Sequence, residues 1–96
     1  MWARTATGQV LPGKMDDFIK VYKEVQQPIM EKAQGIQSVR LLTDLSNNKV
    51  VAVSIWDTDS NARANTERDL KDVINRFEGV TVSAPTFEYY EVSADY

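Results

Sequence analysis

The sequence has 96 residues, of which 14 are acidic, 11 are basic, and none is histidine or cysteine. This length permits one domain with one modest hydrophobic core. The absence of cysteine excludes disulfides, thiolate nucleophiles and cysteine-bound zinc or iron–sulfur centres. The absence of histidine excludes a Ser-His-Asp triad and removes the usual ligand of haem iron and transition metals.

The charge and hydropathy of the chain indicate which partners and which cellular location to expect. The net charge is −3 and no stretch concentrates lysine and arginine, so we expect no nucleic-acid partner. The first twenty residues contain no apolar run of signal-peptide length. No stretch of about 18 apolar residues is present, so we expect no membrane contact and a cytoplasmic location.

The first third of the chain predicts a strand followed by a helix. Residues 2–10 alternate in character and predict a strand. After the turn signal Pro12-Gly13, residues 14–33 predict a helix that kinks or breaks at Pro28, because proline lacks the N–H that a helix interior needs. One face of the strand carries Trp2, Arg4, Ala6, Gly8 and Val10. The apolar stripe of the helix comprises Met15, Phe18, Ile19, Tyr22, Val25 and Ile29.

The rest of the chain predicts a hairpin, a second helix and a last strand. Strands over residues 38–45 and 50–56 flank a polar turn. A helix over residues 59–77 follows, and a strand over residues 86–92 ends the pattern. The stripe of the second helix comprises Ala62, Thr66, Leu70, Val73, Ile74 and Phe77. We expect the core between helices and sheet to contain Phe18, Ile19, Val25, Leu70, Val73, Ile74 and Phe77.

The element order β-α-β-β-α-β is typical of ferredoxin-like α+β folds. We therefore expect a single domain over residues 1–96, with a four-stranded antiparallel sheet and both helices on one face. Residues 50–56 are nearly continuous in apolar side chains, so both faces of this strand should be buried. Since two helices cover only one face, we expect a second copy of the chain to cover the other and form a homodimer.

Short motifs are spread over almost the whole chain. They are Pro12-Gly13-Lys14, Pro28, Gly35-Ile36, Ser54-Ile55-Trp56-Asp57, Pro85 and Tyr90-Glu91-Val92. Through them the chain resembles the antibiotic biosynthesis monooxygenase (ABM) superfamily. The resemblance implies a dimeric α/β barrel. It also implies one of several activities, because the superfamily includes cofactor-independent oxygenases of quinols and polycyclic phenols as well as haem-degrading enzymes.

Two cofactor hypotheses fail on residue identity. The haem-degrading branch has an Asn on the first strand, a Trp in the second helix and a His further along, whereas the matching positions here hold Ala6, Asn65 and Asn75. The segment from Asp57 to Asn61 resembles the start of a calcium loop, but Ala62 and Arg68 stand where that loop needs Gly and Glu. Helix capping explains these acidic residues without a metal. We expect no metal, haem, flavin or nicotinamide cofactor.

The candidate site lies on the helix-facing side of the central strands. Small residues beside Arg4 and Trp56 either outline a cavity or admit close packing of the helices. If a cavity forms, the candidate catalytic groups are Arg4 as an anion stabiliser, with Asn65 and Tyr22 as hydrogen-bonding groups. The candidate substrate contacts are Trp56, Ala6 and Ser54. Trp56 either walls an aromatic pocket or fills the core, and Tyr22 has the same two interpretations.

Two functions of different classes are consistent with the sequence. The first is a cofactor-independent monooxygenase that acts on a small aromatic quinol or polyphenol, with the deprotonated substrate supplying the electrons. The second is a non-catalytic dimer of the same fold that binds a small apolar ligand or has a closed, structural interior. Bulky side chains that fill the space between helices and sheet would favour the second.

Overall fold

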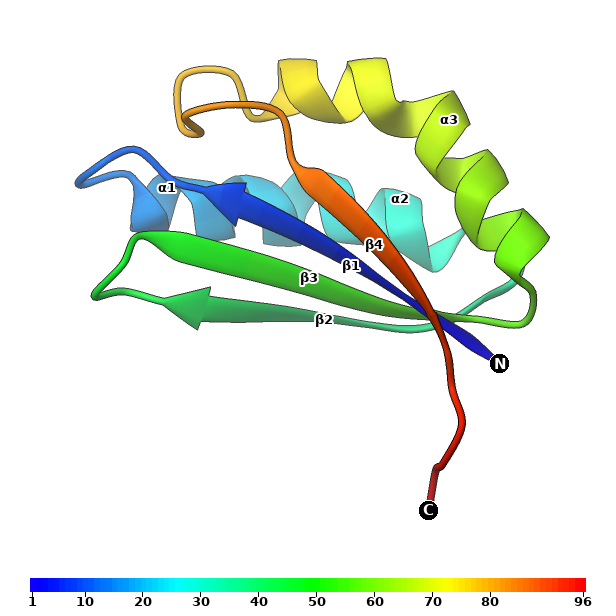
Figure 1. Ribbon diagram of the computed structural model, residues 1–96. Helices are drawn as coiled ribbons and strands as arrows, with labels where there is room; N and C mark the ends of the chain where they lie inside the picture. The colour runs from blue at the N-terminus through cyan, green and yellow to red at the C-terminus, as the bar shows by residue number, and fades with distance from the viewer.

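The computed structural model describes residues 1–96 as one sheet covered by helices (Figure 1). The elements in chain order are β1 (Trp2–Gln9), α1 (Met15–Val21), the π-helical turn η1 (Tyr22–Gln26), α2 (Gln27–Glu31), β2 (Ile36–Asp44), β3 (Lys49–Trp56), α3 (Asp59–Arg76) and β4 (Thr86–Glu91). The strands are ordered β2-β3-β1-β4 and every neighbouring pair is antiparallel. The predicted ferredoxin-like α+β fold is confirmed, with element boundaries within about two residues of those expected.

The strand register fixes which side chains face the helices. Arg4 lies opposite Ser54 on β3 and opposite Tyr89 on β4, and Ala6 lies opposite Ala52. Since side chains on paired positions share a face, these residues form one surface across the three strands. The helix-facing surface at the centre of the sheet therefore combines small residues with one arginine.

The first helical segment contains an extra residue before Pro28. The backbone N–H of Gln27 donates to the carbonyl of Tyr22, five residues earlier, where an α-helix would bond four residues back. Pro28 then occupies the first turn of α2, where its missing N–H is harmless. The predicted break at Pro28 is thus present as a π-helical turn that ends just before it.

This extra residue changes which side chains are buried. Beyond Tyr22 the buried positions are Gln26 (7% exposed) and Met30 (3% exposed). The predicted positions, Val25 and Ile29, are 42% and 38% exposed. Each buried position lies one residue later than an uninterrupted α-helix would place it. The reason is that the π turn contains one extra residue, so every residue after it is rotated relative to the sheet. The prediction of Val25 as a core residue is therefore wrong.

The second long helix, α3, is capped at Thr58, whose hydroxyl accepts a hydrogen bond from the backbone N–H of Asn61 at 3.1 Å. Its ends pack against the rest of the molecule through buried Ala62 and Phe77. Leu70 and Ile74, predicted as core residues, are 37% and 41% exposed. Both side chains line a cavity between α3 and the sheet and do not pack on the sheet. The prediction that they are core residues is therefore wrong.

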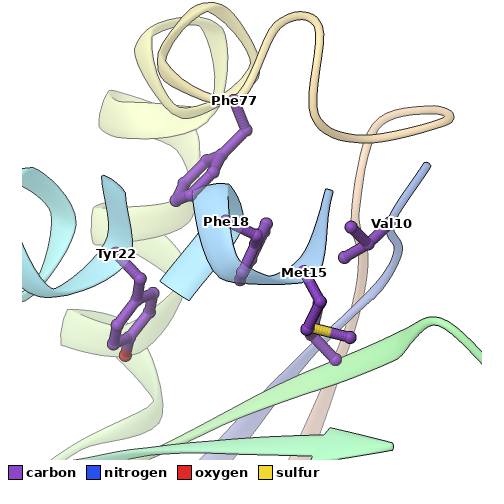
Figure 2. Packing of buried hydrophobic residues seen from close by; sticks show 6 residues of the cluster. Val10, Met15, Phe18, Tyr22 and Phe77 are labelled. Carbon is purple, nitrogen blue, oxygen red and sulfur yellow. The ribbon is translucent and has the colours of Figure 1, made fainter. Parts of the chain in front are cut away.

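Two separate hydrophobic clusters hold the layers together. The larger comprises Val10, Met15, Phe18, Tyr22, Val50 and Phe77 (Figure 2). Ile19 and Val73 are partly buried against it, as predicted. The smaller cluster comprises Met30, Trp56 and Ala62. The two clusters lie toward opposite ends of α3. The middle of α3 therefore lies over the space between the two clusters.

The other face of the sheet carries apolar side chains that no helix of this chain covers. Val51, Val53 and Ile55 on β3 are half-buried, whereas Leu42 and Tyr90 are 51% and 49% exposed. The register places Val51 opposite Leu42 and Val53 opposite Thr5, so they form a continuous surface. Among the helices, none is long and apolar enough to cross a lipid bilayer.

Candidate active site

A cavity of about 90 Å³ lies between the helices and the sheet. Its floor includes Ala6 and Gly8 of β1 and Ala52 of β3, so the small residues leave space here and do not serve close packing. One water molecule needs roughly 10–15 Å³ of such space, and the cavity is therefore large enough for several waters or a small organic ring. Of its 23 lining residues, 13 are hydrophobic, which is typical of ligand sites with a few polar groups.

Arg4 projects from β1 into this cavity and is only 6% exposed. Its Nη1 donates to Asn65 Oδ1 at 2.8 Å and to Thr66 Oγ1 at 3.0 Å, and its Nη2 lies 3.8 Å from Met30 Sδ. Its Nε is buried and has no hydrogen-bond partner. These contacts hold the guanidinium in one orientation and leave one donor unused.

The positive charge of Arg4 has no carboxylate partner. The ion pairs of the chain are Lys14–Asp17, Arg63–Asp59 and Arg76–Asp69. Burial lowers the pKa of Arg4 because desolvation disfavours the charged form, while Tyr89 and Asp69 act in the opposite direction. Arginine nevertheless stays protonated at any ordinary pH. The cavity thus contains a fixed and uncompensated cation.

Trp56 supports Arg4 from behind the cavity. It is completely buried, packs with Met30 and Ala62, and is not among the cavity-lining residues. Its Nε1–H donates to Ser54 Oγ at 2.8 Å, and its ring centroid lies 5.0 Å from the Arg4 guanidinium carbon. The expectation that Trp56 forms the cavity wall is therefore corrected: the indole fills the core and stabilises the cation through its π face.

Tyr22 contributes a second unused donor. The side chain is 5% exposed, it lines the cavity, and its hydroxyl has no hydrogen-bond partner. Figure 2 shows the hydroxyl pointing from the helix toward the sheet. Burial raises the pKa of Tyr22 to about 12, although the charge of Arg4 opposes the increase. Tyr22 is therefore protonated at neutral pH, and its hydroxyl hydrogen has no acceptor within the protein.

Asn65 and Thr66 join α3 to the sheet. Besides accepting from Arg4, Thr66 Oγ1 accepts a hydrogen bond from the Tyr89 hydroxyl of β4 at 2.7 Å. Asn65 uses its carbonyl oxygen for Arg4 and lines the cavity. Two side chains of α3 thus hold the Arg4 guanidinium, and Tyr89 of β4 holds one of them in turn, which preorganises the cation.

Asp69 is the only carboxylate that lines the cavity. Arg76 donates to both of its oxygens, at 2.9 and 2.8 Å, and also to Gln26 Oε1 at 2.8 Å. The pKa of Arg76 is raised, chiefly by its hydrogen bonds to Asp69. Asp69 is therefore engaged in a bidentate ion pair within α3, and Arg76 connects this helix to η1 through its hydrogen bond to Gln26.

The segment that resembles a calcium loop serves as a helix cap. Asp57 Oδ1 accepts from Asn61 Nδ2 at 2.9 Å, and Asp59 accepts from Arg63 Nε at 2.9 Å. No group of three or more acidic side chains is placed to hold a metal ion. The residues present do not form a metal site of that kind.

Five of the six sequence-predicted site residues come together. Arg4, Ala6, Tyr22, Ser54 and Asn65 all line the cavity, and only Trp56 lies outside it. Sequence reasoning missed Gln26 and Met30, because their burial depends on the π turn. It also missed the Thr66–Tyr89 and Asp69–Arg76 pairs. Tyr89 could have been found from its alternation with Phe87, since both lie on the helix-facing side of β4.

A four-stranded antiparallel sheet with its helices packed on one face defines the α+β ferredoxin-like class. The family model for antibiotic biosynthesis monooxygenases (ABM) matches residues 1–70. The chain belongs to the antibiotic biosynthesis monooxygenase family. The matched region includes β1, the first helical segment, β2, β3 and the first two-thirds of α3, and hence Arg4, Tyr22 and Asn65.

Similar proteins extend this finding. The uncharacterized protein Rv2558 of Mycobacterium tuberculosis is 31% identical over 68 residues, which are 71% of this chain and 29% of that protein. The chain thus spans less than a third of the length of this relative. A Bordetella bronchiseptica protein named for the antibiotic biosynthesis monooxygenases has a TM-score of 0.82 at 18% identity, covering 97% of both chains. The protein NE2512 of Nitrosomonas europaea, whose function is unknown, has a TM-score of 0.80 at 12% identity, covering 99% of this chain and 91% of that one. Identities this low show the fold alone.

Proposed function

We propose that the protein is a cofactor-independent monooxygenase that oxidises a small aromatic quinol or polyphenol. The observation that carries the proposal is the buried Arg4 guanidinium, which is held by Asn65 and Thr66, lacks a counter-ion, and lines a largely apolar cavity. A cation fixed in a dry site stabilises a phenolate far more than it would in water. Family membership is consistent with this chemistry.

The proposed reaction needs no group beyond substrate and oxygen. A phenol ring and O₂ give a quinone and water: one oxygen atom replaces a ring hydrogen and forms a carbonyl, and the other leaves in water with the two hydrogens that the phenol loses. The ring supplies the four electrons and O₂ accepts them. Arg4 would stabilise the phenolate, while Phe18, Phe77 and Phe87 supply aromatic surface around the cavity.

We further propose that the working form is a homodimer. The uncovered face of the sheet presents Leu42, Val51, Val53, Ile55 and Tyr90. An apolar strand surface of this kind is covered when a second copy of the same sheet packs against it. The two cavities would then lie on the outer sides of the paired sheets, each within its own subunit.

Oxygen uptake by chelator-treated protein with a panel of quinols tests the function. We expect uptake with at least one quinol, and a loss of about 10²-fold in turnover for Arg4→Ala and for Asn65→Ala, since each change removes a preorganised donor or its support. Arg68→Ala and Asn75→Ala are matched controls, because both residues are exposed on α3. Circular dichroism checks that each variant is folded.

Three outcomes would contradict the proposal. Loss of activity on chelation would show that a metal is needed. Turnover that survives both site variants would place the site elsewhere. Tight binding of quinols with no oxygen uptake at all would favour the non-catalytic ligand-binding function.

A further inference from the structure

The cavity contains three titratable side chains among its lining residues: Arg4, Tyr22 and Asp69. Oxidation of a phenol by O₂ proceeds through its electron-rich anion, so some group must remove the phenolic proton. In most enzymes this is a positioned general base. These three groups are the candidates for that role within the cavity.

None of the three is a free, unpaired base. Arg4 stays protonated. The buried Tyr22 hydroxyl keeps its proton at neutral pH because its pKa is raised to about 12. Asp69 receives two hydrogen bonds from Arg76, at 2.8 and 2.9 Å, and its lone pairs facing that guanidinium are occupied. Behind these groups, the Tyr89 hydroxyl donates its hydrogen bond to Thr66 Oγ1 at 2.7 Å.

Two buried donors lack acceptors. The Nε–H of Arg4 and the hydroxyl of Tyr22 have no hydrogen-bond partner, and both side chains are more than nine-tenths buried. An unsatisfied buried donor is costly, and an unpaired buried cation more so. Both side chains line the same cavity, so an oxyanion bound there would supply an acceptor for these donors and the missing counter-ion. The neutral form of the same ligand could accept a bond but could not neutralise Arg4.

We propose that the cavity takes its ligand already ionised, as a small aromatic monoanion whose oxyanion is bound by Arg4 Nε and the Tyr22 hydroxyl. This inference rests on the proposed function for the aromatic phenol class of the ligand. It adds that the ionisation of the ligand in solution, and not a base on the protein, sets the pH at which the site is used. It assigns Tyr22 the role of donor to the anion, not of proton acceptor.

Binding of 4-nitrophenol tests the inference without any turnover, because the phenolate and the phenol have different absorption bands. We expect the wild-type protein to bind the phenolate at least 10-fold more tightly than the neutral phenol, so that binding lowers the pKa of the ligand. The neutral isostere 4-nitroanisole should bind correspondingly weakly. Tyr22→Phe should weaken phenolate binding about 10-fold, and Arg4→Gln roughly 10- to 100-fold, since hydrogen bonds to charged groups are strong. Arg68→Gln removes the same charge from the exposed surface and should change nothing.

A second measurement uses the wild-type protein alone. Among phenols of graded acidity, the midpoint of the pH dependence of binding should move with the pKa of each phenol. Midpoints that stay at one pH for every phenol would show a titrating protein group and overturn the inference, as would equal affinity for 4-nitrophenolate and 4-nitroanisole. Phenolate binding without oxygen uptake from any quinol would contradict the proposed function but not this inference. Quinol turnover by a protein that shows no preference for the anion would contradict this inference but not the proposed function.

Discussion

The rings of Phe18 and Phe77 stack with their centroids 4.6 Å apart and their planes inclined by 24°. This contact connects α1 to the C-terminal end of α3 (Figure 2), and both rings also line the cavity. Phe77 is 6% exposed. Because Phe77 is the buried residue that anchors this end of α3, the pair should contribute strongly to stability.

Replacing Phe77 by alanine should lower the free energy of unfolding by about 3–5 kcal/mol, the usual cost of deleting a buried phenylalanine side chain. Ile74→Ala is the matched control, since Ile74 lies one turn earlier and is 41% exposed. It should cost about 1 kcal/mol or less. Urea denaturation measures both. Similar losses for the two variants would show that the middle of α3 is packed more tightly than the structure indicates.

Gly35, in the turn between α2 and β2, should tolerate no side chain. Its φ is +85°, and an added Cβ would collide with Asp57 Oδ1 and lie 2.6 Å from Asn61 Nδ2. Gly35→Ala should therefore cost about 2–5 kcal/mol, from backbone strain together with overpacking.

Gly79 separates these two causes. Its φ is +84°, but nothing lies within 4 Å of an added Cβ. Gly79→Ala should cost only about 1–2 kcal/mol, from strain alone. The difference between the two variants in thermal or urea denaturation measures the collision at Gly35. If both variants lose the same stability, the predicted collision is relieved by movement of Asp57 and Asn61.

Tyr22 should make stability fall at high pH. Its pKa is about 12 in the folded protein, against 10.0 for an ordinary tyrosine. Below pH 10 both the folded and unfolded chains keep the proton, and the contribution of Tyr22 is fully present. As the pH rises from 10 toward 12 the unfolded chain releases its proton first, so this contribution is progressively lost.

The measurement is urea denaturation of the wild type and of Tyr22→Phe at steps from pH 8 to pH 12. The difference in unfolding free energy between them should be constant below pH 10 and should change between pH 10 and about 12, with the wild type losing more. Tyr90, whose pKa is also raised, is present in both proteins and cancels. Parallel curves over the whole range would contradict the burial of the Tyr22 hydroxyl.

The proposed homodimer predicts a large interface, on the order of 2,000 Å² or more in total. Light scattering at micromolar concentration should report twice the chain mass of 10.9 kDa, and the apparent stability should rise with protein concentration. Val53→Lys places a charge in the centre of the sheet face and should give a monomer, since an unpaired buried charge is costly. Leu45→Lys is the control, because Leu45 lies after the last residue of β2 and is 69% exposed. A wild-type monomer under these conditions would contradict the proposal.

Strand alternation and turn residues predict most of the fold, because these signals depend only on neighbouring residues. The sequence places Arg4, Ala6 and Gly8 on one strand face, and the structure confirms that this face borders the cavity. The phase of the first helix after Tyr22 could not be predicted in the same way. An ideal period of 3.6 residues selects Val25 and Ile29, and only the π turn exchanges them for Gln26 and Met30.

The candidate site also has features that the sequence predicts and features that it does not. The position of Arg4, Tyr22 and Asn65 at the cavity can be predicted from strand alternation and helix periodicity. The partners of these residues cannot be predicted in this way, because a hydrogen bond between Arg4 and Asn65 joins positions 61 residues apart. The burial of Trp56 also depends on distant Met30 and Ala62. Leu70 and Ile74 were misassigned because an amphipathic stripe does not distinguish a packed core from the wall of a cavity.

The separation of the two hydrophobic clusters has a consequence for how this fold can change over time. Stability is concentrated at the ends of α3, in the contacts of Ala62 and Phe77, whereas Asn65, Thr66 and Asp69 lie between them over the cavity. Substitutions in this middle span can alter what the cavity binds while both anchoring clusters stay intact. An architecture of this kind can change the lining of its cavity at little cost to folding.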